Sequence, residues 1–338
     1  MIVCPLCKSN PVKILRSSTA TQVANSFTPK NVDVNRYNAL KQNLNKLWKN
    51  QAVNIAECWN CKLIFANPFI AGDAEFYSIQ APNTPYPKSK WEYTQTLSKI
   101  LQLFAPSRIS VLDIGAGKGY FLRQLLSQGF TPQSLMSTEF SSVGKASIES
   151  VGVECQSVDI RDLKTTRKFD VICMFQVLEH MDRLDELFST LHELSNPGTC
   201  LFIAVPYGKR IEFNEQFQLL LDNPPNHVSR WSHTSFKVLA EKYNWELSGI
   251  ELQPAHSMYY DMLTAMIDSY LRKTQAGDNW ESRIAKIATN TSLPTRYVKA
   301  LGMIFSPNSW RTAFKVRAYN LKHGVTSESM WVHLTRTA

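Results

Sequence analysis

The 338-residue sequence lacks any apolar run of about 18 residues, the minimum length for a membrane-spanning helix. Its start, MIVCPLCKSN, lacks a basic segment followed by an apolar one, so no secretory signal is expected. We therefore expect a cytoplasmic protein, in which disulfides are rare. Hydrophobic residues make up 44% and charged residues 19%, which excludes wholesale disorder. The length allows one large domain or two smaller ones.

Acidic residues are scarce at both ends of the chain. Residues 1–56 hold eight Lys or Arg and one acid, Asp33, whereas residues 283–327 hold eight Lys or Arg and no acid. The net charge of the whole chain is +9. Two solvated basic faces would explain this pattern. The alternative is an anionic partner, such as a phosphate-bearing acceptor, a nucleic acid or a membrane surface contacted from outside.

The seven cysteines need a role other than disulfide formation. Cys4 and Cys7 form one C-x2-C pair, and Cys58 and Cys61 form another after 50 intervening residues. Two such pairs predict a tetrahedral site of four thiolates, which suits a structural zinc ion because no coordination position stays open. The alternative is four reduced, buried cysteines without metal. The remaining cysteines lie singly in apolar surroundings and are expected in the core: Cys155, Cys173 and Cys200.

Strands and helices alternate between about residues 108 and 206. The expected strands are 109–117, 134–140, 153–160, the start of 169–180, and 198–206, and the expected helices are 119–130, 145–152 and 184–195. This alternation predicts a parallel sheet with helices on both faces and a ligand beyond the carboxyl ends of its strands. Two further strands are expected at 245–254 and 329–336, and a helix within 37–50.

The first strand–loop–helix, VLDIGAGKGYF, carries the sharpest cofactor signal. Its glycines are Gly115, Gly117 and Gly119, which give G-x-G-x-G rather than the dinucleotide fingerprint G-x-G-x-x-G. Asp113 would repel a pyrophosphate but suits a ligand with a cationic head. S-adenosylmethionine (SAM) has an ammonium group, a sulfonium group and no phosphate. Glu139, after the second strand, is placed for ribose hydroxyls, and Asp159, after the third, for adenine.

These motifs, with FDVICMFQVLEHM, resemble the class I SAM-dependent methyltransferases over roughly residues 90–257. CPLC and CWNCKLIFANP, followed by EFYS, resemble the zinc ribbon that precedes many such domains in bacteria. The resemblance implies an α/β fold with a Rossmann-like sheet of parallel strands and a C-terminal antiparallel strand. It implies a zinc-binding domain at 1–80 and a methyltransferase domain at 81–338, with a basic helical insertion at 258–327. Further cofactor contacts implied by it are Ile160, Phe175 and Gln176.

The resemblance also implies in-line SN2 transfer of a methyl group to a small-molecule acceptor, because its members occur in glycan and natural-product pathways. Some of them C-methylate nucleotide-linked sugars. A general base is needed only where the acceptor must lose a proton. His227 matches the histidine of a family segment that reads EH-x-S, with Asn226 where relatives often have Glu, and is the expected base or substrate contact. His180 and Tyr207 are further candidates on the substrate side.

Two other functions stay open. An RNA methyltransferase would use the basic ends to hold phosphates. The Asn-Pro-Pro-Tyr signature of amino-methylating enzymes is absent after the fourth strand, and Asn223-Pro224-Pro225 lies elsewhere in a predicted turn. A partner protein that binds SAM without catalysis is the other alternative. The sequence leaves the methylated atom, the acceptor and the oligomeric state open.

Overall fold

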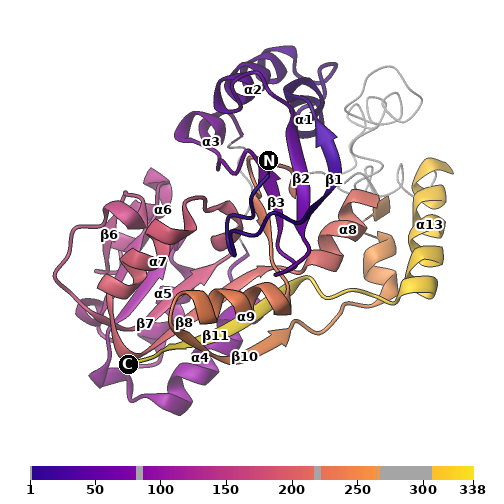
Figure 1. Cartoon of the computed structure of the whole chain (residues 1–338). Helices are drawn as coiled ribbons and strands as arrows, with labels where there is room; N and C mark the ends of the chain where they lie inside the picture. The colour runs from indigo at the N-terminus through magenta and orange to yellow at the C-terminus, as the bar shows by residue number, and fades with distance from the viewer. Residues whose placement is uncertain (1, 81–86, 217–221, 264, 267–306) are drawn as a thin grey trace.

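The computed structural model describes residues 2–80, 87–216, 222–263, 265–266 and 307–338. These residues form a seven-stranded sheet in the order β10-β11-β8-β7-β4-β5-β6 and a four-stranded sheet in the order β1-β2-β3-β9 (Figure 1). The strands of the larger sheet are β4 (Val111–Ile114), β5 (Leu135–Thr138), β6 (Glu154–Gln156), β7 (Phe169–Phe175), β8 (Ser195–Pro206), β10 (Trp245–Leu252) and β11 (Ser329–Arg336). Those of the smaller sheet are β1 (Val12–Ser18), β2 (Val53–Cys58), β3 (Ile64–Asn67) and β9 (Ser229–Arg230).

The larger sheet has the predicted combination of parallel and antiparallel strands. The neighbours among β4, β5, β6, β7 and β8 pair in parallel, whereas β11 runs antiparallel to both β8 and β10. This confirms a Rossmann-like sheet with a C-terminal antiparallel strand. The carboxyl ends of the parallel strands therefore lie at one edge, where a ligand is expected.

Helices cover both faces of this sheet. Consecutive residues of a strand point to opposite faces, and those of β4 are all buried, so both faces need a covering layer. Val111 belongs to a buried cluster with residues of α4 (Trp91–Leu103), α5 (Tyr120–Ser127) and α6 (Ser142–Glu149). Leu112, the next residue, belongs to a second cluster with α7 (Leu184–Glu193) and α9 (His233–Lys242). The three single cysteines are buried, as predicted: Cys155, Cys173 and Cys200.

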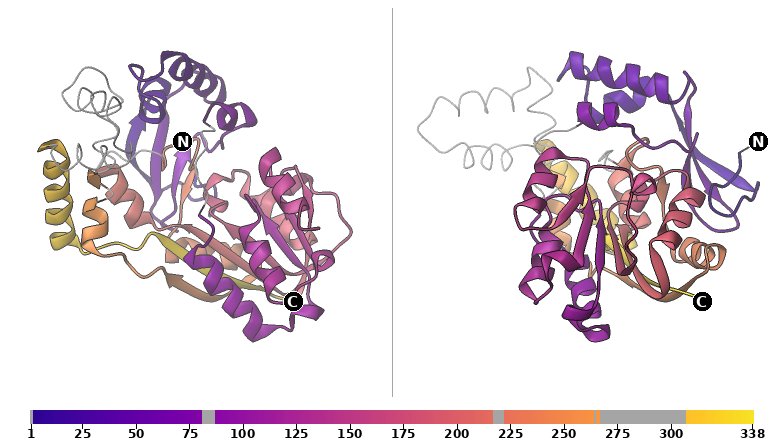
Figure 2. Two further views of the ribbon diagram at one scale, coloured as in Figure 1. Left: turned by 180° about the vertical axis from the view of Figure 1, so that it is seen from behind. Right: turned by 90° about the vertical axis from the view of Figure 1, so that its left-hand side faces the viewer.

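The smaller sheet packs with α1 (Ala20–Phe27) and α2 (Val34–Leu47) above the larger sheet, as all three views in Figures 1 and 2 show. The helix predicted within 37–50 is α2, and its buried Leu40 and Leu44 share a cluster with Val228. Val228 directly precedes β9, so the small sheet takes its last strand from far along the chain. The N-terminal unit of the structure thus includes residues beyond the predicted 1–80.

The remaining described helices are α3 (Ala74–Gln80), α8 (Gly208–Gln216) and α13 (Pro307–His323), with short 3-10 turns at Ile160–Asp162 and Leu178–His180. Of the predicted insertion at 258–327, residues 264 and 267–306 lie outside the described residues. No helix among the described residues is long and apolar enough to cross a membrane.

Candidate active site

The glycine loop after β4 turns sharply toward α5. Gly115, Gly117 and Gly119 all have positive φ, at 67°, 57° and 72°. A Cβ atom on Gly115 would lie 2.7 Å from a methyl group of Val177, so glycine is required there by space as well as by backbone conformation. The loop backbone therefore lies directly against Val177, just beyond the end of β7.

Asp113, on β4 before this loop, is a buried acid. Asp113 is 2% exposed. Burial raises the pKa of Asp113 to about 8, and the charge of Lys90 opposes this shift. A buried carboxyl is costly to ionise unless a cation lies beside it. The site therefore fits the ammonium group that SAM would bring.

Glu139 lies against the glycine loop. Its two carboxylate oxygens accept hydrogen bonds from the backbone N–H of Gly117, at 2.8 Å, and of Ser141, at 2.7 Å. Burial raises the pKa of Glu139, and these two donors oppose the shift. Each oxygen keeps a lone pair, because a carboxylate has about four acceptor positions. The structure thus brings Glu139 and the loop together in a geometry that leaves room for ribose hydroxyls.

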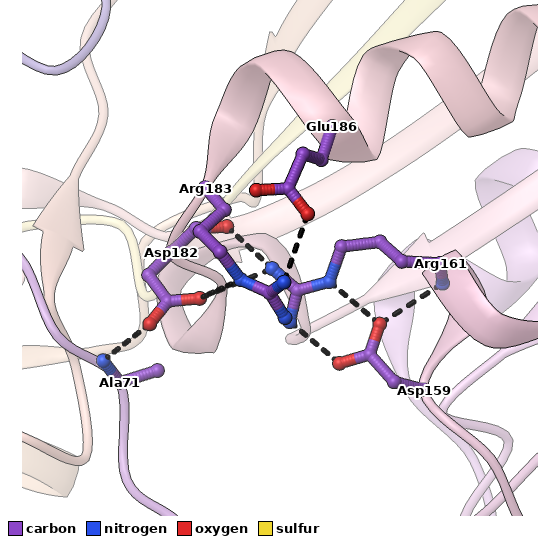
Figure 3. A network of polar contacts seen from close by, with 6 residues as sticks. All are labelled: Ala71, Asp159, Arg161, Asp182, Arg183 and Glu186. Carbon is purple, nitrogen blue, oxygen red and sulfur yellow. Dashed lines mark hydrogen bonds and ion pairs between the residues drawn. The ribbon is translucent and has the colours of Figure 1, made fainter.

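Asp159 follows β6 and is held by Arg161 (Figure 3). The guanidinium donates Nε to Oδ1 at 2.7 Å and Nη2 to Oδ2 at 2.6 Å. Arg161 also donates Nη1 to Asp182 at 3.0 Å, and Asp182 accepts the backbone N–H of Ala71 at 3.1 Å. These bonds to Arg161 lower the pKa of Asp159 although burial opposes them. An adenine amino group would share this carboxylate with Arg161, and Ile160 beside it is buried.

Phe175 and Gln176 end β7 in different surroundings. The ring of Phe175 is buried, with its centroid 5.0 Å from that of Tyr93 and 4.9 Å from that of Phe121. Gln176 has φ +60° and donates its amide to Ser329 Oγ at 3.1 Å. Phe175 therefore supports the site from the core, while Gln176 lies at the strand end where a cofactor would pass.

Three titratable side chains meet at the acceptor side, at the end of β7. Glu179, His180 and His227 each offer a ligand atom, and these atoms lie within 4.8 Å of one another, close enough to hold a cation. The imidazole centroids of His180 and His227 are 4.6 Å apart. His180 Nδ1 lies 2.6 Å from the carbonyl oxygen of Asn226 and 3.1 Å from the hydroxyl of Tyr77. The structure therefore brings together two of the three predicted catalytic residues.

Glu179 is a second buried acid, which the sequence did not single out as a site residue. It is 1% exposed, and neither carboxylate oxygen has a hydrogen-bond partner among the residues that the structure describes. Burial raises its pKa to about 7, and the charge of His227 opposes that shift. Burial and the charge of His227 lower the pKa of His180, which keeps that ring neutral.

Asp222 was also missed from the sequence. Its Oδ1 lies 3.0 Å from His227 Nδ1, and its Oδ2 accepts a hydrogen bond from Asn214 at 3.1 Å. Burial raises the pKa of Asp222, but the contact with His227 outweighs it and the pKa is lowered overall. Asp222 thus supplies the carboxylate that Asn226 does not. The only sequence signal was the Pro-Pro turn that lies between Asp222 and His227.

Comparison with known proteins identifies the kind of domain that contains this site. Residues 90–248 match the family model of the methyltransferase domain. Over these residues the chain carries a methyltransferase domain. The protein is accordingly a methyltransferase enzyme that binds SAM, as the glycine loop and its acids predicted.

The relatives of this methyltransferase match about half of the chain. The ubiquinone biosynthesis O-methyltransferase of Rickettsia canadensis is 23% identical over 166 residues, which span 46% of this chain and 68% of that protein. The enzyme of the same name from Rickettsia bellii is 22% identical over 46% of this chain and 67% of that protein. A SAM-dependent methyltransferase from Archaeoglobus fulgidus is structurally similar, at 13% identity and TM-score 0.44, over 72% of this chain and 94% of that one. Coclaurine N-methyltransferase, at 16% identity and TM-score 0.44, is matched over 72% of each chain.

Tyr207, the third predicted catalytic residue of the methyltransferase, follows β8. Its backbone N–H donates to the carbonyl of Glu328 at 2.9 Å, and its own carbonyl accepts the N–H of Arg210. No hydrogen bond joins its hydroxyl to His180 or His227 in the described part of the chain. The structure therefore places Tyr207 just after the carboxyl end of β8, without a hydrogen bond from its hydroxyl to either histidine.

The four N-terminal cysteines of the methyltransferase converge on one point. Sγ of Cys4 lies 3.6 Å from Sγ of Cys61, and Sγ of Cys7 lies 3.5 Å from Sγ of Cys58. A tetrahedral zinc ion with Zn–S bonds of about 2.3 Å sets its sulfurs about 3.8 Å apart. Cys4, Cys58 and Cys61 are fully buried. The geometry and the chemistry of this donor set fit a structural zinc ion.

Proposed function

We propose that the enzyme transfers a methyl group from SAM to a hydroxyl group of a small-molecule acceptor, and that His227 removes the hydroxyl proton. The observation that carries this proposal is the 3.0 Å separation of His227 Nδ1 and Asp222 Oδ1. With its proton on Nδ1, facing Asp222, the imidazole keeps Nε2 as the basic atom. The relatives named as O-methyltransferases support a hydroxyl acceptor.

SAM supplies an activated methyl group, so the protein's task is alignment and proton removal. As the acceptor oxygen forms its bond to the methyl carbon, the carbon–sulfur bond breaks and the hydroxyl proton passes to Nε2 of His227. Asp222 orients the ring and stabilises the imidazolium that results. The partly buried His180 is neutral and packs beside His227, where we place it as an acceptor contact.

For the cofactor, we assign roles by the contacts described above. Asp113 would hold the ammonium group, the glycine loop the methionine portion, and Glu139 the ribose hydroxyls. Asp159 would meet the adenine amino group while Arg161 holds it in place. Gln176 and Ile160 are assigned to the cofactor by their positions after β7 and β6, and Tyr207 to the acceptor side by its position after β8.

We also propose that the four-cysteine cluster holds one structural zinc ion. The sulfur positions fit a tetrahedral ion, and the cluster joins the buried core that includes α7 and α9. Zinc there would fix the loops around Cys4 and Cys58 and leave no open position for catalysis.

The acceptor class is tested with purified enzyme, methyl-labelled SAM and an extract of the source cells divided into RNA and small-molecule fractions. We expect label in the small-molecule fraction, insensitive to ribonuclease, on a hydroxyl-bearing compound such as a sugar nucleotide or a natural-product intermediate. Label in RNA would replace the proposal with an RNA methyltransferase that uses its basic surface for phosphates. Absence of label, together with tight SAM binding, would favour a SAM-binding partner protein.

The base is tested by H227Q and D222N in the same assay, with H233Q as the control because His233 is exposed at the start of α9. We expect H227Q to lower the labelling rate by roughly 100-fold or more and D222N by a similar order, since general-base catalysis contributes factors of this size. SAM affinity should stay within about two-fold. Full activity of H227Q would exclude the proposed base.

A further inference from the structure

We propose that Arg16, on the first strand of the N-terminal sheet, is a positioning residue for the Asp222–His227 pair. The inference rests on the proposed function, because it gives the N-terminal unit a part in aligning the base. It concerns residues about 200 positions apart in the sequence, which the fold brings into contact.

Arg16 reaches the loop that carries Asp222. Its Nη2 donates a hydrogen bond to Oδ1 of Asn223 at 2.5 Å and lies 3.1 Å from Oε1 of Glu215, near the end of α8. Glu215 also pairs with Arg230 of β9, at 2.5 Å and 3.1 Å. Arg16 thus holds the residue next to Asp222 on one side and, through Glu215, the strand that follows His227 on the other.

Asn223 is the centre of this loop. Its Nδ2 donates to Oγ of Ser26, near the end of α1, at 3.0 Å. Its carbonyl oxygen accepts the backbone N–H of Asn226 at 3.0 Å and of His227 at 3.3 Å. A shift of Asn223 therefore moves Asp222, which precedes it, and the backbone of His227 together. The amide of Asn223 is held at both ends by the N-terminal unit.

The segment after His227 is fixed from two directions as well. The N–H of Val228 donates to the carbonyl of Glu179 at 2.8 Å, and the N–H of Ala66 on β3 donates to the carbonyl of Val228 at 2.9 Å. The β3–β9 pairing continues this contact. Backbone pairing sets the position of His227, and side-chain contacts, among them that of Arg16 with Asn223, hold the loop from Asp222 to Asn226.

Arg16 contributes to the orientation of the Asn223 side chain more than to the stability of the fold. Its side chain is 36% exposed, and ion pairs at that exposure add little to stability. The charge-assisted hydrogen bond to Asn223 still fixes direction, because a guanidinium donates along set lines. Loss of the side chain should leave the protein folded while the Asp222–His227 contact loosens.

The variant is R16Q, and K13Q is its matched control because Lys13 is an exposed cation on the same strand. In ¹⁵N-histidine-labelled protein, the imidazole nitrogens of His227, assigned with H227Q, report the tautomer directly. We expect a single tautomer protonated on Nδ1 in wild type and K13Q, and a mixture in R16Q. R16K, which keeps the charge but not the planar fork, should lie between them.

Turnover provides the second measurement, with methyl-labelled SAM at saturation and the small-molecule fraction of source-cell extract as acceptor. We expect R16Q to lower the labelling rate about 10-fold, with SAM affinity within about two-fold of wild type. In a D222N background R16Q should have little further effect, because residues that act through one contact are not additive.

An R16Q protein with the wild-type tautomer would overturn the inference, as would an equal rate loss with and without D222N. Full labelling by H227Q would instead overturn the proposed base, and the tautomer measurement would still decide whether Arg16 positions the pair. The two failures are therefore distinguishable.

Discussion

Asp113 makes SAM binding depend on pH. Burial raises its pKa to about 8, so in the free enzyme the carboxyl is largely protonated at neutral pH. A cation beside it favours the ionised form. SAM affinity should therefore rise from about pH 6 to about pH 8, with release of a proton that calorimetry in two buffers can count. D113N should bind SAM more weakly and lose this slope, and a slope retained by D113N would contradict the assignment.

Glu179 makes stability depend on pH in the opposite sense. Its pKa of about 7 in the folded protein lies above the unfolded value of roughly 4.3, so its protonated form favours folding at low pH. That contribution is lost as the pH rises from the unfolded pKa through the folded pKa of about 7. E179Q should match wild type below about pH 4 and be more stable by up to about 4 kcal/mol near pH 8. Denaturant unfolding of both proteins measures this, with E246Q, an exposed control, expected to change neither value.

The short turn Ile160–Asp162 links the adenine side of the site to the rest of the domain. Arg161 bridges Asp159 and Asp182, whereas Arg183 pairs with Glu186 and Asp182 and makes no hydrogen bond to Asp159 within the described residues (Figure 3). R161Q should raise the dissociation constant of SAM about 10-fold and leave the labelling rate at saturating SAM nearly unchanged. R183Q serves as the matched control in the same titration. Equal effects of the two variants would show that the turn does not depend on Arg161.

The strands inside the alternating segment were predictable from the sequence, and those of the N-terminal sheet were not. Each strand of the seven-stranded sheet was expected because an apolar run repeats between helical segments, and α2 because Leu40 and Leu44 recur at helical spacing. Strand β9 spans only Ser229–Arg230, too short for any alternation to show. Its pairing with β3 depends on the neighbouring strand and not on its own residues.

The residues of the candidate site also divide into those that the sequence predicts and those that it does not. Asp113 and the glycine loop follow directly on one strand, so their order in the sequence reveals their proximity. Asp222 meets His227 only after the Pro-Pro turn, and Arg16 reaches Asn223, the residue next to Asp222, only through the folded N-terminal sheet. Such contacts depend on the three-dimensional path of the chain, which motif spacing does not contain.

At the scale of the whole molecule, loss of the metal from the cysteine cluster should lower the rate at which the acceptor is methylated. C58S should lose the zinc that metal analysis is expected to find at about one ion per wild-type chain. Because the cluster packs against α7 and α9, we expect the melting temperature of C58S to lie several degrees below that of wild type. SAM affinity should change less than the labelling rate, since β9 and the loop before it lie nearest the N-terminal sheet. A metal-free wild type with unchanged melting temperature would exclude a structural ion.

The pairing of β3 with β9 also sets an order of assembly during synthesis. Strands β1, β2 and β3 leave the ribosome early, but the strand that completes their sheet emerges only after about residue 230. Until then β3 presents an open edge of unpaired backbone groups, which is prone to join other chains. The N-terminal sheet must therefore wait for the catalytic domain, and nascent chains that stall before β9 should be the species most dependent on chaperones.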